Sequence, residues 1–234
     1  FKNTKSNYCK LRYAYQLIRS AHDKKGYMQT LALYEDVLPK TDNNPSLIED
    51  WIEGHKAGAL MGLGRNVEAA YIYSKIFHNT PSKRATAYQS FTIKTDAEWE
   101  ACLRLCQSDE ERATLYALRA NDPNSLAVED MEAIYHINPK NEHLALLLVQ
   151  EIQKLEKDLL GGDFNKKKEK NWRYHKIPRK QVGKNLLDLL KLVLLVGEEK
   201  KVDNLALWQI AEGYLELLGG DYYAAKNTLG HLRG

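Results

Sequence analysis

Apolar residues recur at intervals of three and four along almost the whole chain, and strict alternation of apolar and polar residues is nearly absent. The first pattern is typical of amphipathic α-helices that bury one face, whereas alternation would indicate strands. Short polar breaks rich in glycine, proline and asparagine separate the helical segments. They fall at 23–26, 43–45, 62–64, 80–81, 121–123, 138–139 and 219–220. The sequence therefore predicts an all-α protein.

The breaks divide the helical pattern into about six pairs of helices. Because the links within most pairs are short, paired helices must run antiparallel, and repeated pairs of similar length stack side by side. The sequence thus predicts an α-α superhelix, a solenoid of about six antiparallel helix pairs that forms a single domain over residues 1–234. The predicted pairs are 6–22 with 26–38, 46–63 with 66–78, 82–91 with 95–106, 109–120 with 124–137, 142–160 with 181–197, and 204–218 with 221–232.

Four of the pairs share an internal register, anchored by a small residue in the second helix. The anchors are Thr30, Ala69, Ala127 and Ala225. The positions twelve residues before them hold Ile18, Ala57, Leu115 and Gly213. The positions four residues after them hold Tyr34, Tyr73, Met131 and Leu229, and those seven after hold Val37, Ile76, Ile134 and Leu232. Small residues allow two helices to cross closely, and the residues four and seven further on fill the groove between them.

Three segments carry this register most clearly: 213–225 (GYLELLGGDYYAA), 134–141 (IYHINPKN) and, more weakly, 64–71 (GRNVEAAY). They resemble the tetratricopeptide (TPR) family of helical repeats. The chain departs from that family in its anchor spacings of 39, 58 and 98 residues, where a TPR repeat has about 34. The pair at 82–106 is short and has no clear signature, so the repeats are degenerate.

The resemblance implies a non-catalytic scaffold for protein–protein interaction. Such a scaffold would bind a peptide or partner protein on a concave face lined by the first helix of each pair. The candidate partner-binding residues on those helices are Tyr15, Arg19, Glu53, Lys56, Arg84, Tyr88, Arg112 and Tyr116.

One segment, 161–181, lacks helical periodicity and reads as a long loop inserted between two helices. From 166 to 184 it carries nine basic residues and one acidic residue, a net charge of +8, so that the rest of the chain, which is +3 overall, carries −5. As an alternative function, this loop could bind nucleic acid or another anion, with cations on phosphates and aromatic rings on bases. The plainer interpretation is a solvated insertion pinned by Trp172 and Ile177. The candidate anion-binding residues are Lys166, Lys167, Lys168, Lys170, Trp172, Arg173, Tyr174, Lys176, Arg179 and Lys180.

The chain shows no arrangement of residues that is typical of an enzyme, so we expect none, and neither a metal ion nor a cofactor. Cys102 and Cys106 are four residues apart and are expected to pack as small hydrophobic side chains on one helix face. No CxxC, HxxxH, HExxH or GxSxG spacing occurs. The isolated histidines are expected at helix surfaces or helix ends; they are His22, His55, His78 and His231.

The sequence shows neither a signal peptide nor an apolar run long enough to cross a membrane, and it does not indicate a compartment. The most apolar run, 185–197, is interrupted by Asp188 and Lys191. Because the sequence begins at Phe1, we expect a processed protein or part of a longer one. A further alternative is therefore a helical accessory domain of a larger cell-envelope protein.

Overall fold

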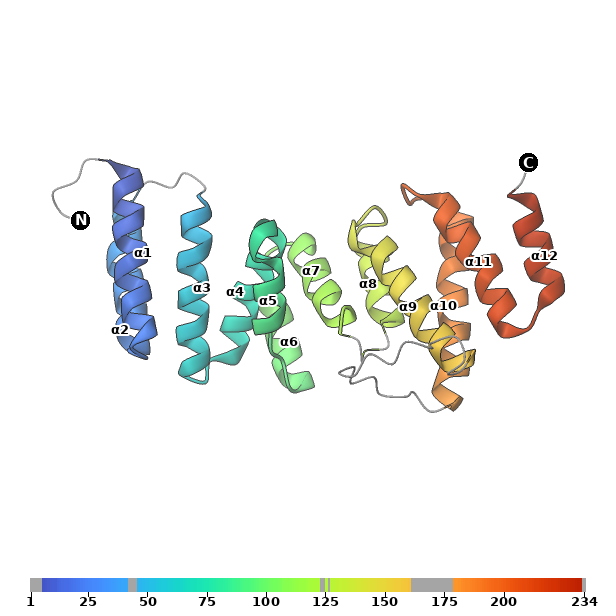
Figure 1. Cartoon of the computed structure of the whole chain (residues 1–234), viewed down its shortest axis with the longest axis horizontal. Helices are drawn as coiled ribbons and strands as arrows, with labels where there is room; N and C mark the ends of the chain where they lie inside the picture. Colours follow the sequence, from blue (N-terminus) through green and yellow to red (C-terminus); the bar gives the residue numbers. More distant parts are fainter. Residues whose placement is uncertain (1–5, 42–45, 123–124, 126, 161–178, 233–234) are drawn as a thin grey trace. The chain divides into compact units, whose positions relative to one another are not determined.

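The computed structural model describes residues 6–41, 46–122, 125, 127–160 and 179–232, and within these residues all regular secondary structure is helical (Figure 1). This confirms the all-α prediction. The α-helices are α1 (Asn7–Asp23), α2 (Tyr27–Val37), α3 (Leu47–Gly62), α4 (Asn66–Asn79), α5 (Arg84–Ser90), α6 (Asp96–Leu105), α7 (Asp109–Ala120), α8 (Val128–Ile137), α9 (His143–Leu159), α10 (Arg179–Glu199), α11 (Leu205–Gly219) and α12 (Tyr222–His231). Two short 3₁₀ helices, η1 (Leu38–Lys40) and η2 (Pro81–Lys83), precede α3 and α5.

Each of these helices corresponds to one predicted from the periodicity, and most of the observed helix ends lie within two residues of the predicted ends. Two starts differ. Helix α8 begins at Val128, four residues later than predicted, because the Ser125 hydroxyl donates hydrogen bonds to the carbonyls of Ala120 and Asp122 in a turn before it. Helix α10 begins at Arg179, so the loop predicted over 161–181 wrongly includes the first three residues of the helix. Pro178 directly precedes this start, and proline is common at helix N-termini.

Side-chain caps explain several of the helix starts. The Ser46 hydroxyl accepts a hydrogen bond from the Ile48 amide, and the Glu49 carboxylate accepts one from the Ser46 amide (3.2 Å each). This arrangement satisfies amide groups that the first turn of α3 leaves without a helical partner. Thr95 caps α6 in the same way, by accepting from the Glu98 amide.

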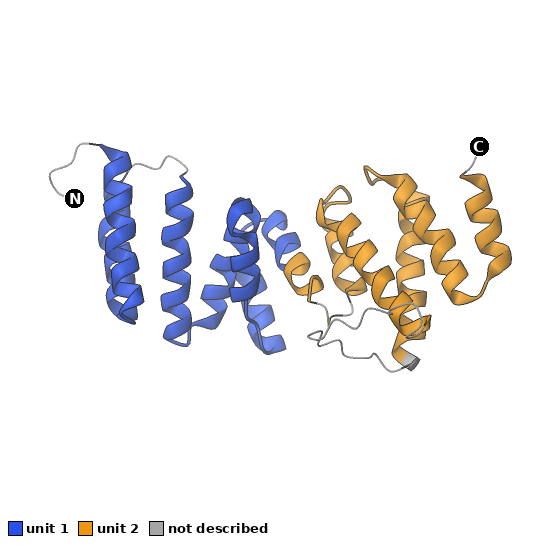
Figure 2. Cartoon of the chain, viewed as in Figure 1, with its two compact units in different colours: residues 1–115 blue, residues 116–234 orange. Residues whose placement is uncertain are grey.

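The chain divides into two compact units, residues 1–115 and 116–234 (Figure 2), and each is described by itself. In the first unit, α1 packs against α2 and α3, α3 packs against α4, and α4 carries α5 and α6. Its buried core around α1 to α3 includes Ala14, Ile18, Val37 and Ile52. Glycine allows α3 to approach its neighbours: a Cβ atom on Gly62 would lie 2.3 Å from the Tyr27 ring.

In the second unit, α10 packs against α8, α9 and α11, and α12 packs against α11. Trp208 and Leu147 are among its fully buried side chains. At the crossing of α11 and α12, a Cβ atom on Gly213 would lie 2.6 Å from Leu229 Cγ, so any other residue at 213 would displace the Leu229 side chain. The predicted register identified both residues.

The register is supported by burial. The four anchors Thr30, Ala69, Ala127 and Ala225 are all buried, as are the four residues twelve positions before them. Among the groove-filling residues, Tyr34 and Leu229 are partly buried, and Leu232 lies exposed beyond the end of α12. Most of the positions that the register names are therefore buried, in both units.

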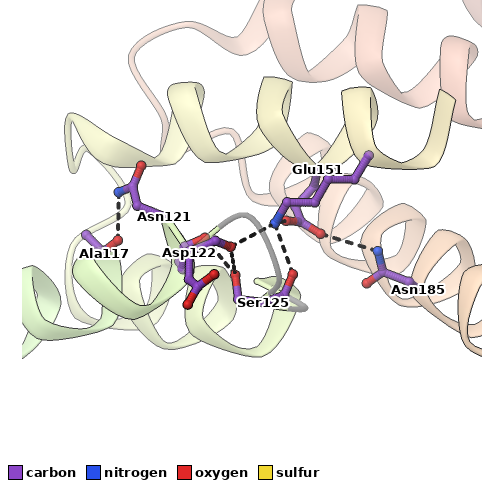
Figure 3. Close-up of polar contacts among 8 residues, drawn as sticks. Ala117, Asn121, Asp122, Ser125, Glu151 and Asn185 are labelled. Atoms are coloured by element: carbon purple, nitrogen blue, oxygen red, sulfur yellow. Dashed lines mark hydrogen bonds and ion pairs between the residues drawn. The ribbon is translucent and has the colours of Figure 1, made fainter. Parts of the chain in front are cut away.

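A buried ionic cluster connects three parts of the second unit (Figure 3). The Lys154 ammonium on α9 donates to the Glu151 carboxylate one turn earlier and to the Ser125 carbonyl (3.0 Å). The Asn185 amide on α10 donates to the other oxygen of Glu151 (3.3 Å). Because Glu151 is fully buried, these partners are what make its burial tolerable. The cluster thus attaches the link between α7 and α8 to α9 and α10.

None of the described helices combines the length and the apolar character that a membrane crossing requires.

Candidate partner-binding site

A cavity of about 190 Å³ opens on the first unit, on the side of the first helices of its pairs. It is formed by α1, α3, α4, η2 and α5. Its lining combines buried apolar residues with aromatic and polar ones at the rim. The lining residues are Tyr15, Asp50, Trp51, Gly54, His55, Tyr73, Ile76, Lys83, Thr86, Ala87 and Ser90.

Three rings from two helices form one wall of the cavity. Trp51 and His55 are four residues apart and therefore share a face of α3. Tyr15 of α1 packs against both, with ring centroids 5.6 Å from Trp51 and 5.5 Å from His55. The tilted geometry of these pairs is one that aromatic rings favour, and it holds the rings in place. The three rings thus form one aromatic surface.

Polar groups lie at the edge of this aromatic wall. The Lys83 ammonium lies 5.3 Å from the centre of the Trp51 ring, within the range of a cation–π interaction. The Asp50 carboxylate accepts a hydrogen bond from the Thr80 hydroxyl (2.6 Å). The indole Nε1 of Trp51 is buried and has no hydrogen-bond partner in the described structure. A buried donor without a partner is uncommon in folded proteins.

His55 continues the cavity wall toward the end of α1. Burial lowers the pKa of its imidazole below the ordinary value, and the neighbouring His22 ring lowers it further. The Nδ1 atoms of His22 and His55 lie 3.3 Å apart. His55 is therefore neutral at neutral pH, with a lone pair on one ring nitrogen.

Two predicted residues of α1 lie on the cavity side. Tyr15 lines the cavity, and Arg19, one turn further on, is exposed and forms an ion pair with Asp23 (3.4 Å). On α5, Tyr88 is half-buried beside the lining residue Ala87. Arg84 uses its Nε to donate to the carbonyl of Phe77 (3.1 Å), so it has a structural contact at the start of α5.

Glu53 and Lys56 contact α2 and are not part of this cavity. The Tyr34 hydroxyl donates to the Glu53 carboxylate, and the Lys56 ammonium lies 3.8 Å from the centre of the Tyr34 ring. Burial raises the pKa of Tyr34, and the Glu53 carboxylate raises it further, so the Tyr34 hydroxyl stays protonated. Lys56 instead lines a second, wider cavity of about 600 Å³, which also involves Met28, Leu31 and Ile72.

The remaining predicted residues lie on α7. Arg112 forms an exposed ion pair with Asp109 (2.6 Å), and Tyr116, which belongs to the second unit, is half-buried with the Arg119 guanidinium 5.8 Å from its ring centre. The structure therefore places Tyr15 and Arg19 on one side of the first unit and Glu53 and Lys56 against another helix.

Of the lining residues, only Tyr15 was in the predicted set. The missed residues include the three that form the aromatic wall and its edge with Tyr15: Trp51, His55 and Lys83. The four-residue spacing of Trp51 and His55 was the available signal, because it places two rings on one face of the helix that follows Tyr15. The sequence held no such signal for Lys83, because its approach to the Trp51 indole depends on the packing of η2.

The basic-aromatic loop lies largely outside the described residues. This applies to Lys166, Lys167, Lys168, Lys170, Trp172, Arg173, Tyr174 and Lys176. Arg179 and Lys180 form the start of α10, and the structure describes only their backbone. The anion-binding hypothesis therefore remains a prediction.

The two clustered thiols are buried, as predicted. Cys102 and Cys106 are 0% and 8% exposed. Burial raises the pKa of Cys102 to about 12 and that of Cys106 to about 11. Since the thiolate is the reactive form, both side chains behave as small apolar residues at neutral pH.

No family model, no curated protein and no solved structure matches this chain. The resemblance to TPR repeats therefore remains a prediction based on the register and its three best segments.

Proposed function

We propose that this chain is a helical-repeat interaction module that holds a peptide or a partner protein at the cavity between α1, α3 and α5. The observation that carries the proposal is the aromatic wall of Tyr15, Trp51 and His55 beside buried apolar residues. Tyrosine and tryptophan are enriched among the residues that contribute most to protein–protein binding.

The size of the cavity favours an anchor side chain over a whole small molecule. Sites for drug-sized ligands have volumes of about 300–1,000 Å³, whereas this cavity has about 190 Å³. We infer that the guest inserts an apolar side chain against Tyr73, Ile76 and Ala87.

Part of this proposal is that the helix pairs stack as an α-α superhelix. The support is the shared register, whose four anchors are buried. The sequential packing of α1 on α3 and of α3 on α4 within the first unit is also what a repeat array requires.

The test starts from random linear peptides selected for binding to the full chain, with affinities measured by calorimetry. We expect selected peptides to share an apolar or aromatic residue. Replacing Tyr15 by alanine should cost more than about 1 kcal/mol of binding free energy, the threshold that separates important interface residues from neutral ones. The W51F variant keeps an aromatic ring in the wall, and should cost less binding free energy than Y15A does.

The matched control is Y13A, since Tyr13 is an exposed tyrosine on the same helix and does not line the cavity. It should bind as the wild type does. The proposal fails if Y15A, with an unchanged circular dichroism spectrum, binds the selected peptides as tightly as Y13A.

A further inference from the structure

Two histidines that lie far apart in the sequence meet at the end of α1. His22 is in the last turn of α1 and His55 is in α3, and their Nδ1 atoms lie 3.3 Å apart. Asp23 Oδ1 lies 4.0 Å from His22 Nδ1. One ligand atom from each of the three side chains fits within a mutual distance of 4.8 Å.

We propose that His22, Asp23 and His55 form a binding site for a divalent transition-metal ion of the zinc type. The proposal does not depend on whether the neighbouring cavity holds a peptide. Two imidazole nitrogens and a carboxylate oxygen are a donor set that zinc accepts, with a fourth position left for water or another ligand.

The geometry of the imidazole pair matches such an ion. Zinc–nitrogen bonds of about 2.0–2.1 Å at a tetrahedral angle place the two nitrogens about 3.3–3.4 Å apart. The observed separation is 3.3 Å. The carboxylate is within the distance that a rotation of the exposed Asp23 side chain can close.

The surroundings hold these ligands in place. The His22 ring occupies the space above Gly58, where a Cβ atom would lie 2.6 Å from Nε2. It also packs against the rings of Tyr27 (5.9 Å) and His55 (5.2 Å). His55 in turn packs against Tyr15. Packing therefore restricts both rings, and restricted ligands lose less entropy when they bind an ion.

The position of two ligands at the C-terminal end of α1 favours a cation, whereas the positive charge of nearby Arg19 opposes it. Arg19 pairs with Asp23 Oδ2, and Oδ1 is the oxygen nearest to His22, which is the arrangement of an outer partner that orients a ligating carboxylate. His22 and Asp23 are the last two residues of α1, where the helix dipole is negative.

The test is zinc binding by calorimetry, using metal-free, untagged full chain at pH 7.5. All variants carry the substitution C9S, because Cys9 is the only one of the three cysteines that is not buried and a free thiol would also bind zinc. We expect one strong site per chain. The variants H22Q and H55Q should each weaken zinc binding by at least about tenfold, since loss of even an outer partner costs 10–100-fold. Cobalt substitution should give the visible absorption of a four-coordinate ion.

The matched control is H78Q. His78 also faces one carboxylate, Glu110 at 3.5 Å, but it belongs to no described group of three ligands, so its loss should leave zinc affinity unchanged. A G58A variant removes no ligand but displaces the His22 ring, and should also weaken binding. Circular dichroism and melting temperature verify that each variant is folded.

Two results would overturn the proposal. One is the absence of a strong zinc site in the C9S chain, which would mean that the two rings only share a hydrogen bond. The other is zinc binding that persists at full strength in the folded H22Q/H55Q double variant, which would assign the ion to other residues. Peptide binding by these variants is measured separately, so that failure of the metal site and failure of the proposed function are distinguishable.

Discussion

At the scale of single residues, the pair Arg119 and Asp130 shows how burial and charge compete. Asp130 is 4% exposed, and the Arg119 guanidinium donates to both of its carboxylate oxygens. Burial raises the pKa of Asp130, and the hydrogen bonds and charge of Arg119 oppose this effect without cancelling it. The ionised carboxylate is therefore less favourable in the folded chain than in the unfolded chain.

This sign leads to a prediction on pH. Because the pKa of Asp130 is higher in the folded chain, its contribution to stability is fully present at a pH below its pKa in the unfolded chain. This contribution is lost as the pH rises through its pKa in the folded chain. Removing Arg119 increases the loss, because the buried carboxylate is then without this partner. We expect R119A to lower the free energy of unfolding by about 1–3 kcal/mol at pH 7, and by less at pH 4, in urea titrations.

The control for this prediction lies on the same helix. Arg112 pairs with Asp109, but both side chains are exposed, at 46% and 72%. Exposed pairs contribute little, so R112A should cost no more than about 1 kcal/mol at either pH. Equal losses for R119A at pH 4 and pH 7 would show that Asp130 is not the origin of the effect.

At the scale of helices, the ionic cluster of the second unit (Figure 3) gives the clearest prediction. In K154M, the carboxylate of Glu151 stays buried without its cation. We expect a loss of about 3–5 kcal/mol in the free energy of unfolding, which is typical when one member of a buried pair is removed. The double variant E151Q/K154M should recover most of it. It buries no charge, and the glutamine can still accept the hydrogen bond from Asn185.

A double-mutant cycle in chemical denaturation measures this coupling. The control is K184M on α10, where Lys184 is 74% exposed and lies 3.9 Å from Asp188; its effect should be close to zero. If E151Q/K154M is no more stable than K154M, then the uncompensated charge is not what destabilises the single variant.

The helices themselves were largely predictable from the sequence. A period of 3.6 residues requires only local information, and glycine, proline and capping residues mark the ends. The register even identified Gly213 and Leu229, which meet where α11 and α12 cross. The late start of α8 was not predictable, because it depends on the hydrogen bonds that the Ser125 hydroxyl makes in the preceding turn.

The candidate site was predictable only in part. Tyr15 was among the predicted residues, because it lies on the first helix of a pair. The meeting of His22 and His55 could not be predicted, since 33 positions separate them and their contact depends on how α1 packs on α3. Glu53 lies on a first helix as well, yet it accepts a hydrogen bond from Tyr34, so helix identity alone did not determine which face a residue occupies.

At the scale of the whole molecule, charge is distributed unevenly along the chain. Residues 166–184 carry +8 while the rest carries −5. An acidic body repels nucleic acid, so any affinity for it must come from the basic segment. The anion-binding alternative therefore predicts that a labelled single-stranded oligonucleotide binds with an affinity that falls steeply as salt rises. Replacing Lys166, Lys167 and Lys168 by glutamine should lower the slope of log K against log salt by up to about 2, since each neutralised phosphate contributes about 0.7.

Fluorescence anisotropy across a salt series tests this prediction against a variant of equal charge. In K24Q/K94Q/K226Q, three exposed lysines outside the basic segment are replaced, so the net charge of the chain falls by the same amount. If long-range charge alone attracts the oligonucleotide, both triple variants weaken binding equally, because a distributed field depends on the total charge. If the segment makes direct phosphate contacts, only the 166–168 variant changes the slope. If the 166–168 variant binds the oligonucleotide as the wild type does, the anion-binding alternative is eliminated. The cavity lined by Tyr15, Trp51 and His55 then remains as the proposed binding site.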